Sequence, residues 1–212
     1  MKNECLIVSG GVENKIGFMY PNGFDNVFVI ACDKGYEYVL HQNIPCDYIL
    51  GDFDSFSGTI PDGAEKLPVQ KDDTDTMYAV KKAVEKGFQK IYLTCACGGR
   101  HDHSISNIQS LVYAKNHIPE TSEVALFDEN NEVYILKNET AVLKKRVGYS
   151  LSVLSFSEKS EGVTIKGAEY EVSDFTLTND FPLGQSNAWR EDEVKITVKN
   201  GTLLVILSKV EL

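Results

Sequence analysis

Two short stretches of the chain combine residue types that are typical of a metal–phosphate site. In the first, Gly51-Asp52-Phe53-Asp54-Ser55, two carboxylates stand two residues apart, directly after the apolar run Tyr48–Leu50. Alternate residues of an extended strand point the same way, so both charges can reach one place. Neighbouring carboxylates repel, and a divalent cation between them relieves that repulsion. Taken alone, the stretch fits a solvated turn equally well, because Gly, Asp and Ser are turn residues.

The second stretch, Gly98-Gly99-Arg100-His101-Asp102-His103, contains groups that suit a phosphate. Glycines let the backbone approach a ligand, and the Arg100 guanidinium presents a fork of donors to phosphate oxygens. Asn107 follows His103 by one helical turn, so both can reach a common ligand. The alternative is a glycine-rich turn with an exposed Arg100. The stretch matches neither the Walker A loop nor the G-x-G-x-x-G fingerprint.

A third polar stretch, Lys71-Asp72-Asp73-Thr74-Asp75, stands just before a helical pattern. Asp73 or Thr74 can cap the free amides of that helix, and acidic side chains are favoured near its positive end. Capping explains one or two of the acids, but less readily three acids and a Lys within five residues. We therefore expect a binding role for this stretch in addition to capping.

The late stretch Gly184-Gln185-Ser186-Asn187-Ala188-Trp189 holds the single Trp of the chain beside three side chains that can form hydrogen bonds. From its chemistry alone, we expect a loop with a Trp that anchors it to a core.

The first half of the chain alternates short apolar runs with helical patterns, which favours a mostly parallel sheet covered by helices. Strands are predicted at Cys5–Val8, Val27–Cys32, Tyr48–Leu50, Ile91–Cys95 and Val124–Phe127, and helices at Thr74–Lys86 and Ser104–Asn116. Ligands of such sheets bind beyond the carboxyl ends of the strands. Asp33, the Asp52/Asp54 pair and the Arg100/Asp102 pair each follow a predicted strand, so we expect them at one edge of the sheet.

The second half contains only strand patterns, which predicts a small antiparallel β-sandwich. These patterns cover Glu132–Leu136, Ala141–Lys145, Ser150–Phe156, Gly162–Lys166, Glu193–Lys199 and Thr202–Ser208. Asn200-Gly201 predicts a hairpin between the last two. We place the domain boundary near Asp128–Asn131, giving an α/β domain over residues 1–129 and a sandwich over residues 130–212.

Composition narrows the class of protein. The chain has 212 residues, 42% of them hydrophobic, and a formal net charge of −10, with no run of Lys and Arg that resembles the basic face of a nucleic-acid binder. A nucleic-acid partner is disfavoured because it requires a basic face, and no apolar run approaches the roughly 20 residues of a membrane span. The odd number of cysteines, five, and the short apolar run after Lys2-Asn3-Glu4 predict reduced thiols in a cytoplasmic protein.

Taken together and in order, these motifs resemble the thiamine pyrophosphokinase (thiamine diphosphokinase) family. Four family elements are matched, by Asp33-Lys34-Gly35, by Gly51–Ser55, by Lys71, Asp72, Thr74 and Asp75, and by Gly98, Gly99, Arg100, Asp102, His103 and Asn107. A late Ser-Asn pair matches Ser186 and Asn187. The resemblance spans roughly Asp33 to Trp189.

The resemblance implies an α/β domain that binds nucleotide and metal, followed by a thiamine-binding β-sandwich. It implies transfer of a diphosphate group from ATP to the hydroxyl of thiamine, with Mg²⁺, in a homodimer whose active sites lie where the subunits meet. Asp52, Asp54 and Asp75 are the expected metal ligands, and with Arg100 they form the expected catalytic set. The expected nucleotide-binding residues are Asp33, Ser55, Lys71, Thr74, Gly99, Asp102, His103 and Asn107. Ser186, Asn187 and Trp189 are expected to bind thiamine.

Two alternatives compete with this interpretation. A haloacid-dehalogenase-like phosphohydrolase also has an apolar strand leading into Asp-x-Asp, with Asp52 as nucleophile and Asp54 as acid/base, but it leaves the Arg100 stretch and the sandwich unexplained. A non-catalytic protein that binds nucleotide or thiamine is the other alternative, and the large set of carboxylates disfavours it.

Overall fold

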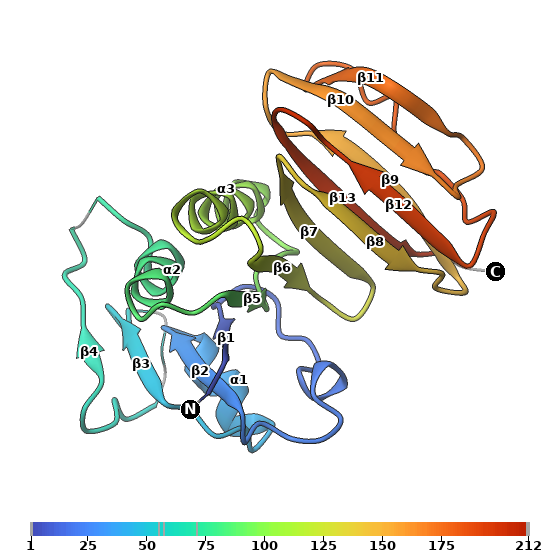
Figure 1. The fold of residues 1–212 in the computed structure, drawn as a ribbon. Coiled ribbons are helices and arrows are strands. Elements are labelled where there is room, and N and C mark those ends of the chain that lie inside the picture. Colours follow the sequence, from blue (N-terminus) through green and yellow to red (C-terminus); the bar gives the residue numbers. More distant parts are fainter. Residues whose placement is uncertain (1, 55, 57, 71, 211–212) are drawn as a thin grey trace. The chain divides into compact units, whose positions relative to one another are not determined.

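The computed structural model describes residues 2–54, 56, 58–70 and 72–210. It divides into two compact units, Met1–Glu129 and Asn130–Leu212. The first unit contains the helices α1, α2 and α3, and the second is built from strands (Figure 1).

A parallel sheet forms the centre of the first unit, with the strand order β4-β3-β2-β1-β5-β6. The strands are β1 (Glu4–Val8), β2 (Val27–Cys32), β3 (Tyr48–Gly51), β4 (Glu65–Lys66), β5 (Lys90–Thr94) and β6 (Glu123–Phe127). Cys5, Leu6, Ile7 and Val8 of β1 have no exposed surface, as expected for the central strand of a covered sheet.

Three α-helices flank this sheet: α1 (Gly35–His41), α2 (Asp75–Glu85) and α3 (His101–His117). A short 3-10 helix, η1 (Gly17–Met19), lies between β1 and β2. Helices α2 and α3 pack against each other on one face of the sheet, and α1 covers the other (Figure 1). The Thr74 side chain accepts a hydrogen bond from the Met77 backbone N–H at 3.1 Å, which caps α2.

The second unit is an antiparallel β-sandwich. One of its sheets has the order β7-β13-β9 and the other β11-β10-β12-β8. The strands are β7 (Asn131–Lys137), β8 (Thr140–Lys144), β9 (Tyr149–Ser155), β10 (Lys159–Lys166), β11 (Val172–Thr178), β12 (Glu193–Thr197) and β13 (Thr202–Lys209). Alternate side chains of both sheets, including Val153, Ile165, Ile196 and Val205, form one buried core.

The fold class predicted from the sequence is confirmed, a mostly parallel sheet with helices followed by antiparallel strands. The hairpin prediction at Asn200-Gly201 is wrong. Strand β12 pairs with β8 and β10, whereas β13 pairs with β7 and β9, so the link over residues 198–201 joins different sheets. Hydrogen bonds to other segments hold this link in place. The Asn200 N–H donates to the Glu161 carbonyl, and the Gly201 N–H donates to the Asn138 side chain. Among the described helices, none is long and apolar enough to cross a membrane.

Candidate active site

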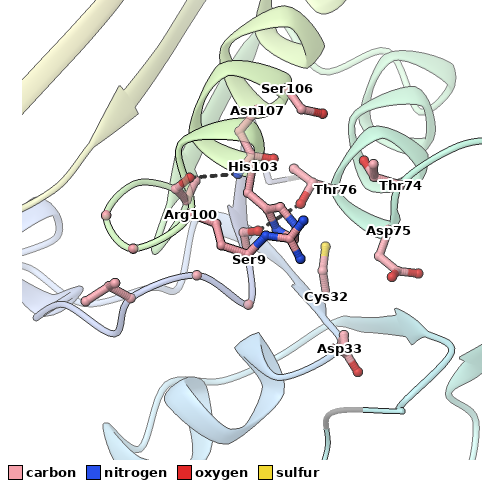
Figure 2. A pocket seen from close by; sticks show the side chains of 16 residues that line it. Ser9, Cys32, Asp33, Thr74, Asp75, Thr76, Arg100, His103, Ser106 and Asn107 are labelled. Atoms are coloured by element: carbon pink, nitrogen blue, oxygen red, sulfur yellow. Dashed lines mark hydrogen bonds between the residues drawn. The ribbon is translucent and has the colours of Figure 1, made fainter.

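A cavity of about 410 Å³ opens beyond the carboxyl ends of β1, β2 and β5. The chain leaves β1 toward β2 on one side, while β5 lies on the other side, so the cavity occupies the point where the strand order reverses, the usual ligand site of such sheets. Figure 2 shows Arg100 and His103 entering the cavity from the start of α3, and Asp33 and Asp75 entering from the end of β2 and the start of α2. The lining consists of Ser9, Gly10, Gly11, Val12, Cys32, Asp33, Thr74, Asp75, Thr76, Ala96, Gly98, Gly99, Arg100, His103, Ser106 and Asn107.

The segment Ser9-Gly10-Gly11, which was not predicted as part of a site, follows β1 and forms one wall of the cavity. The buried hydroxyls of Ser9 and Thr76 form a hydrogen bond of 2.8 Å that ties this segment to α2 (Figure 2). The Gly11 N–H donates to the Cys95 carbonyl at 2.8 Å, and a Cβ on Gly11 would lie 2.6 Å from that oxygen. Only glycine permits this close approach. The signal in the sequence was a Gly-Gly pair directly after a buried strand.

The ends of β2 and β3 meet closely at Asp33. The Asp33 N–H donates to the Leu50 carbonyl at 2.8 Å, and Asp33 adopts the left-handed conformation with φ 47°. A Cβ on Gly51, where φ is 152°, would lie 3.0 Å from the Asp33 Cα. Glycine at position 51 therefore lets the end of β3, directly before Asp52, lie close to Asp33.

Three carboxylates gather at this point. One side-chain oxygen from each of Asp33, Asp52 and Asp54 lies within 4.8 Å of the others. The sequence predicted that Asp52 and Asp54 lie together because alternate residues of an extended strand point the same way, and this explanation is wrong. Strand β3 ends at Gly51 and Phe53 has φ 59°, so Asp52 and Asp54 belong to a turn. Within this turn the Asp54 N–H donates to the Asp52 carboxylate at 3.3 Å.

The chemistry of this group fits a hard divalent cation, since Mg²⁺ prefers oxygen ligands and keeps several waters. Among the described residues, the group contains Asp33, which the sequence assigned to the nucleotide, and it does not contain Asp75, which the sequence assigned to the metal. Asp75 lines the cavity together with Asp33. Asp33 thus belongs both to the carboxylate group and to the cavity lining.

The residues of the acidic stretch before α2 have different roles. Thr74 caps the helix, Asp75 stands in its first turn, and Asp73 forms an ion pair of 2.6 Å with Lys81. Thr74 and Asp75 line the cavity. Two residues expected at the site, Ser55 and Lys71, lie outside the described part of the chain.

The turn that leads into α3 brings Gly99, Arg100, His103 and Asn107 to the cavity. Gly98 and Gly99 have φ values of 86° and 72°, which favour glycine. The buried Asn107 side chain donates to the Ala96 carbonyl at 2.7 Å and so fixes this turn (Figure 2).

The Arg100 side chain forms an ion pair with Asp102. Its Nε and Nη2 donate to both oxygens of Asp102, at 3.1 and 2.5 Å. The hydrogen bond from Arg100 lowers the pKa of Asp102 to about 2, and the His103 backbone N–H, which donates to the same carboxylate at 3.0 Å, contributes. The pair therefore stays charged at neutral pH and holds the guanidinium at the start of α3. Asp102 is thereby placed against Arg100, and it is not among the residues that line the cavity.

Cys32 is the one thiol in the cavity lining. Burial raises its pKa well above the usual range, so the thiol is protonated and is no nucleophile at neutral pH. Among the described residues of the lining, no thiolate is available as a nucleophile. The charged side chains of the lining are Asp33, Asp75 and Arg100, and His103 lies beside them.

In the second unit, Asn187 lines a separate cavity of about 190 Å³ with the apolar residues Ile165, Val172, Leu177 and Leu183. The Asn187 amide is buried and is bonded to the backbone of Tyr170. The Ser186 backbone has φ 56°, and its N–H donates to the Ser152 hydroxyl at 3.0 Å.

Trp189 packs against the core of the sandwich, and its indole N–H donates to the Tyr149 carbonyl at 3.1 Å. This contact fits the anchoring role that its chemistry alone predicted for the loop.

Comparison with known proteins identifies the family. A family model described as "Thiamin pyrophosphokinase, catalytic domain" matches residues 24–121, and a model described as "Thiamin pyrophosphokinase, vitamin B1 binding domain" matches residues 137–203. The chain belongs to the thiamin pyrophosphokinase family. The resemblance drawn from the motifs is thus confirmed, and one model falls in each unit.

Members of this family resemble the chain over nearly its whole length. A thiamine pyrophosphokinase from Bacillus subtilis (strain 168) is 28% identical over 210 residues, which cover 95% of this chain and 97% of that protein. The crystal structure of thiamine pyrophosphokinase from Bacillus subtilis has a TM-score of 0.85 at 24% identity and covers 99% of this chain and 100% of that one. Thiamin pyrophosphokinase from Candida albicans has the same fold, with a TM-score of 0.79 at 14% identity over 98% and 89% of the two chains.

Proposed function

We propose that this chain transfers a diphosphate group from ATP to the hydroxyl of thiamine, giving thiamine diphosphate and AMP. The observation that carries the proposal is the match of both thiamin pyrophosphokinase models, in order, one in each unit of the chain. The arrangement of the first unit supports it, because a carboxylate group adjoins a cavity that Arg100 and His103 line. Polyphosphate transfer requires groups of both kinds.

Mg²⁺ fits the carboxylate group, and we propose that Asp33, Asp52 and Asp54 hold it, with Asp75 as a further ligand directly or through water. When bound, the cation neutralises charge on the phosphate oxygens, which is its usual contribution to phosphoryl-type transfer.

The residues of the chain position the reactants. Arg100 binds phosphate oxygens, and the backbone at Gly99 and His103, at the positive end of α3, favours the same anionic ligand. Asp102 orients the Arg100 guanidinium, Asn107 fixes the turn through Ala96, and Thr74 supports the nucleotide-facing end of α2. The roles of Ser55 and Lys71 in nucleotide binding remain predictions.

In the reaction, the thiamine hydroxyl oxygen forms a bond to the β-phosphorus of ATP, and the bond from that phosphorus to the oxygen shared with the α-phosphate breaks. AMP leaves with that oxygen. The proton of the hydroxyl passes to a carboxylate of the site. Because the chain supplies charge and orientation rather than a nucleophile, no covalent enzyme intermediate is needed.

Thiamine is assigned to the loop of the second unit that carries Ser186, Asn187 and Trp189. Ser186 is exposed and offers its hydroxyl, while the half-buried ring of Trp189 offers an aromatic face to a cationic ligand. Asn187 supports the loop through Tyr170. The vitamin B1 binding model, which spans residues 137–203, supports this assignment.

We further propose that the protein is a homodimer with its active sites where the two subunits meet, as the family resemblance implies. A mixture of Asp54→Asn and Ser186→Ala chains tests this, because in a mixed dimer one of the two shared sites combines the intact Asp54 of one chain with the intact Ser186 of the other, while the second site carries both substitutions. Recovered activity supports a shared site, and two inactive variants that stay inactive when mixed contradict it. A cytoplasmic location remains a prediction.

The activity itself is tested by incubating the full chain with ATP, thiamine and Mg²⁺ and separating the products by chromatography. We expect AMP and thiamine diphosphate in equal amounts, and neither without thiamine. Hydrolysis of p-nitrophenyl phosphate with no AMP would favour the phosphohydrolase. Tight binding of both ligands in a calorimeter with no turnover would favour a binding protein.

A further inference from the structure

Phe53 lies between two acidic side chains of the proposed metal site, yet it is only 7% exposed. Its φ of 59° lies in the left-handed region, which is unfavourable for a side chain with a Cβ. Such a conformation persists only where surrounding contacts hold it. The turn that carries Asp52 and Asp54 is therefore fixed by something other than its own backbone preference.

Aromatic contacts provide that fixation. The Phe53 ring meets the Phe56 ring edge-on, with centroids 6.0 Å apart, and the Phe56 ring lies 5.7 Å from the Tyr36 ring. We call these three residues the aromatic anchor. Tyr36 belongs to the first turn of α1, and its N–H donates to the Asp33 carbonyl at 3.0 Å. The anchor thus connects the turn of Asp52 and Asp54 to the segment of Asp33.

The need for such an anchor follows from electrostatics. Three carboxylates whose oxygens lie within 4.8 Å of one another repel, and without a cation that repulsion drives them apart. Apolar contacts do not depend on the cation, so they can hold the group together before it binds. Preorganised ligands bind more tightly because less ordering remains to be done.

We propose that Phe53 is a positioning residue for the metal-binding carboxylates, holding Asp52 and Asp54 against Asp33 through its contacts with Phe56 and Tyr36. The inference rests on the proposed function, because it takes the carboxylate group to be the Mg²⁺ site. Phe53 is not among the residues that line the cavity, so its role is to support the carboxylates.

Mn²⁺ binding to the full chain, followed by electron paramagnetic resonance with and without a nonhydrolysable ATP analogue, tests the proposal directly. We expect Phe53→Ala to weaken Mn²⁺ binding about 10- to 100-fold, as is typical when the support of a metal ligand is removed. Phe53→Gly separates the ring from the turn, because glycine adopts a positive φ without strain. It should weaken binding as well, whereas Phe53→Leu, which keeps an apolar side chain, should recover most of the affinity.

Phe28→Ala is the matched control. Its ring also packs on another Phe ring, that of Phe88 at 5.3 Å, but it lies near the amino end of β2, away from Asp33. It should lower thermal stability and leave Mn²⁺ affinity unchanged. Phe56→Ala, which removes the half-buried ring between Phe53 and Tyr36, keeps the test available should Phe53→Ala not fold, and it too should weaken Mn²⁺ binding.

The outcomes separate the inference from the proposed function. If wild-type protein binds Mn²⁺ and folded Phe53→Ala and Phe53→Gly bind it equally well, the positioning role is wrong while the metal site stands. If wild-type protein binds no Mn²⁺ even with the ATP analogue, both are wrong. If Phe28→Ala weakens binding as much as Phe53→Ala, the effect is general destabilisation, and the positioning role is again wrong.

Discussion

Asn187 holds the backbone of Tyr170 at both of its polar groups. The Asn187 Oδ1 accepts from the Tyr170 N–H at 2.9 Å, and Nδ2 donates to the Tyr170 carbonyl at 2.8 Å. The same Oδ1 also accepts from the Ala188 N–H at 2.9 Å. The side chain that the sequence assigned to thiamine is therefore committed largely to its own loop, and any part it takes in binding depends on the shape that it gives to that loop.

Replacing Asn187 with Ala should lower the free energy of unfolding by about 1–3 kcal/mol, because two backbone N–H groups and one carbonyl lose their partner. Under the proposed function, the KM for thiamine should rise more than the KM for ATP. Asn187→Asp keeps the acceptor, but it sets a charged carboxylate oxygen against the Tyr170 carbonyl in a buried position, so it should be destabilising as well. Denaturant unfolding and steady-state kinetics measure both.

The control for this prediction is Asn200→Ala, which removes one hydrogen bond from an exposed Asn side chain to Glu161. It should change the free energy of unfolding by less than about 0.5 kcal/mol. An Asn187→Ala protein as stable as this control would contradict the role assigned to Asn187.

Asp54→Asn should abolish AMP formation, with a loss of roughly a thousandfold or more, because one charged ligand of the proposed metal site is removed. Asp54 is exposed and stands in a group of three carboxylates, so without metal the variant should be at least as stable as wild type. Added Mg²⁺ and ATP should raise the melting temperature of wild type and not that of the variant.

Asp62→Asn is the matched control, an exposed Asp in the turn before β4. It should keep both the activity and the Mg²⁺-dependent stabilisation. Normal turnover by Asp54→Asn would remove Asp54 from the metal site.

The strands of the fold could be predicted because their signal is local. The run Val27–Cys32 is apolar throughout, and β2 occupies the same residues. The helix α1 was missed because it has seven residues, too few for a periodic pattern to stand out. Strand β11 was missed because most of Val172–Thr178 is exposed at a sheet edge, where little selects apolar residues.

The site was only partly predictable for a different reason. Motifs indicate which side chains carry chemistry, and the ends of β2, β3 and β5 bring several of them to one edge of the sheet. Which carboxylates meet depends on the left-handed backbone at Asp33 and Phe53 and on the close approach at Gly51. Residue types at a given spacing do not specify such angles, so the partnership of Asp33 with Asp52 and Asp54 emerged only from the structure.

Thr74 allows capping and nucleotide binding to be separated. Its hydroxyl accepts from the Met77 N–H at 3.1 Å, so Thr74→Ala should lower the free energy of unfolding by about 1 kcal/mol, while Thr74→Ser keeps the cap. If the hydroxyl also serves the nucleotide, the KM for ATP should rise in the Ala variant and not in the Ser variant. Thermal unfolding and ATP titrations measure the two effects. An Ala variant with unchanged stability would contradict the capping role.

The ion pair of Arg100 and Asp102 predicts a specific response to pH. Arg100 lowers the pKa of Asp102 to about 2, so the folded state binds this proton less readily than the unfolded state. The contribution of the pair to stability is therefore fully present above about pH 4, where an unfolded Asp is ionised, and is lost as the pH falls toward 2. Its size should be small, because the side chains are 71% and 63% exposed and water screens them.

Arg100→Gln should raise the pKa of Asp102 toward about 3.9, the value of an unperturbed Asp, as carboxyl-carbon NMR titration would show. Arg190→Gln, which breaks an exposed ion pair with Glu171 in the second unit, should leave the pKa of Asp102 unchanged. Under the proposed function, Arg100→Gln should also raise the KM for ATP, and Asp102→Asn should do so less, because the guanidinium remains but loses its orienting partner. Equal effects of the two variants on the KM for ATP would show that orientation matters as much as the charge itself, contrary to the order expected here.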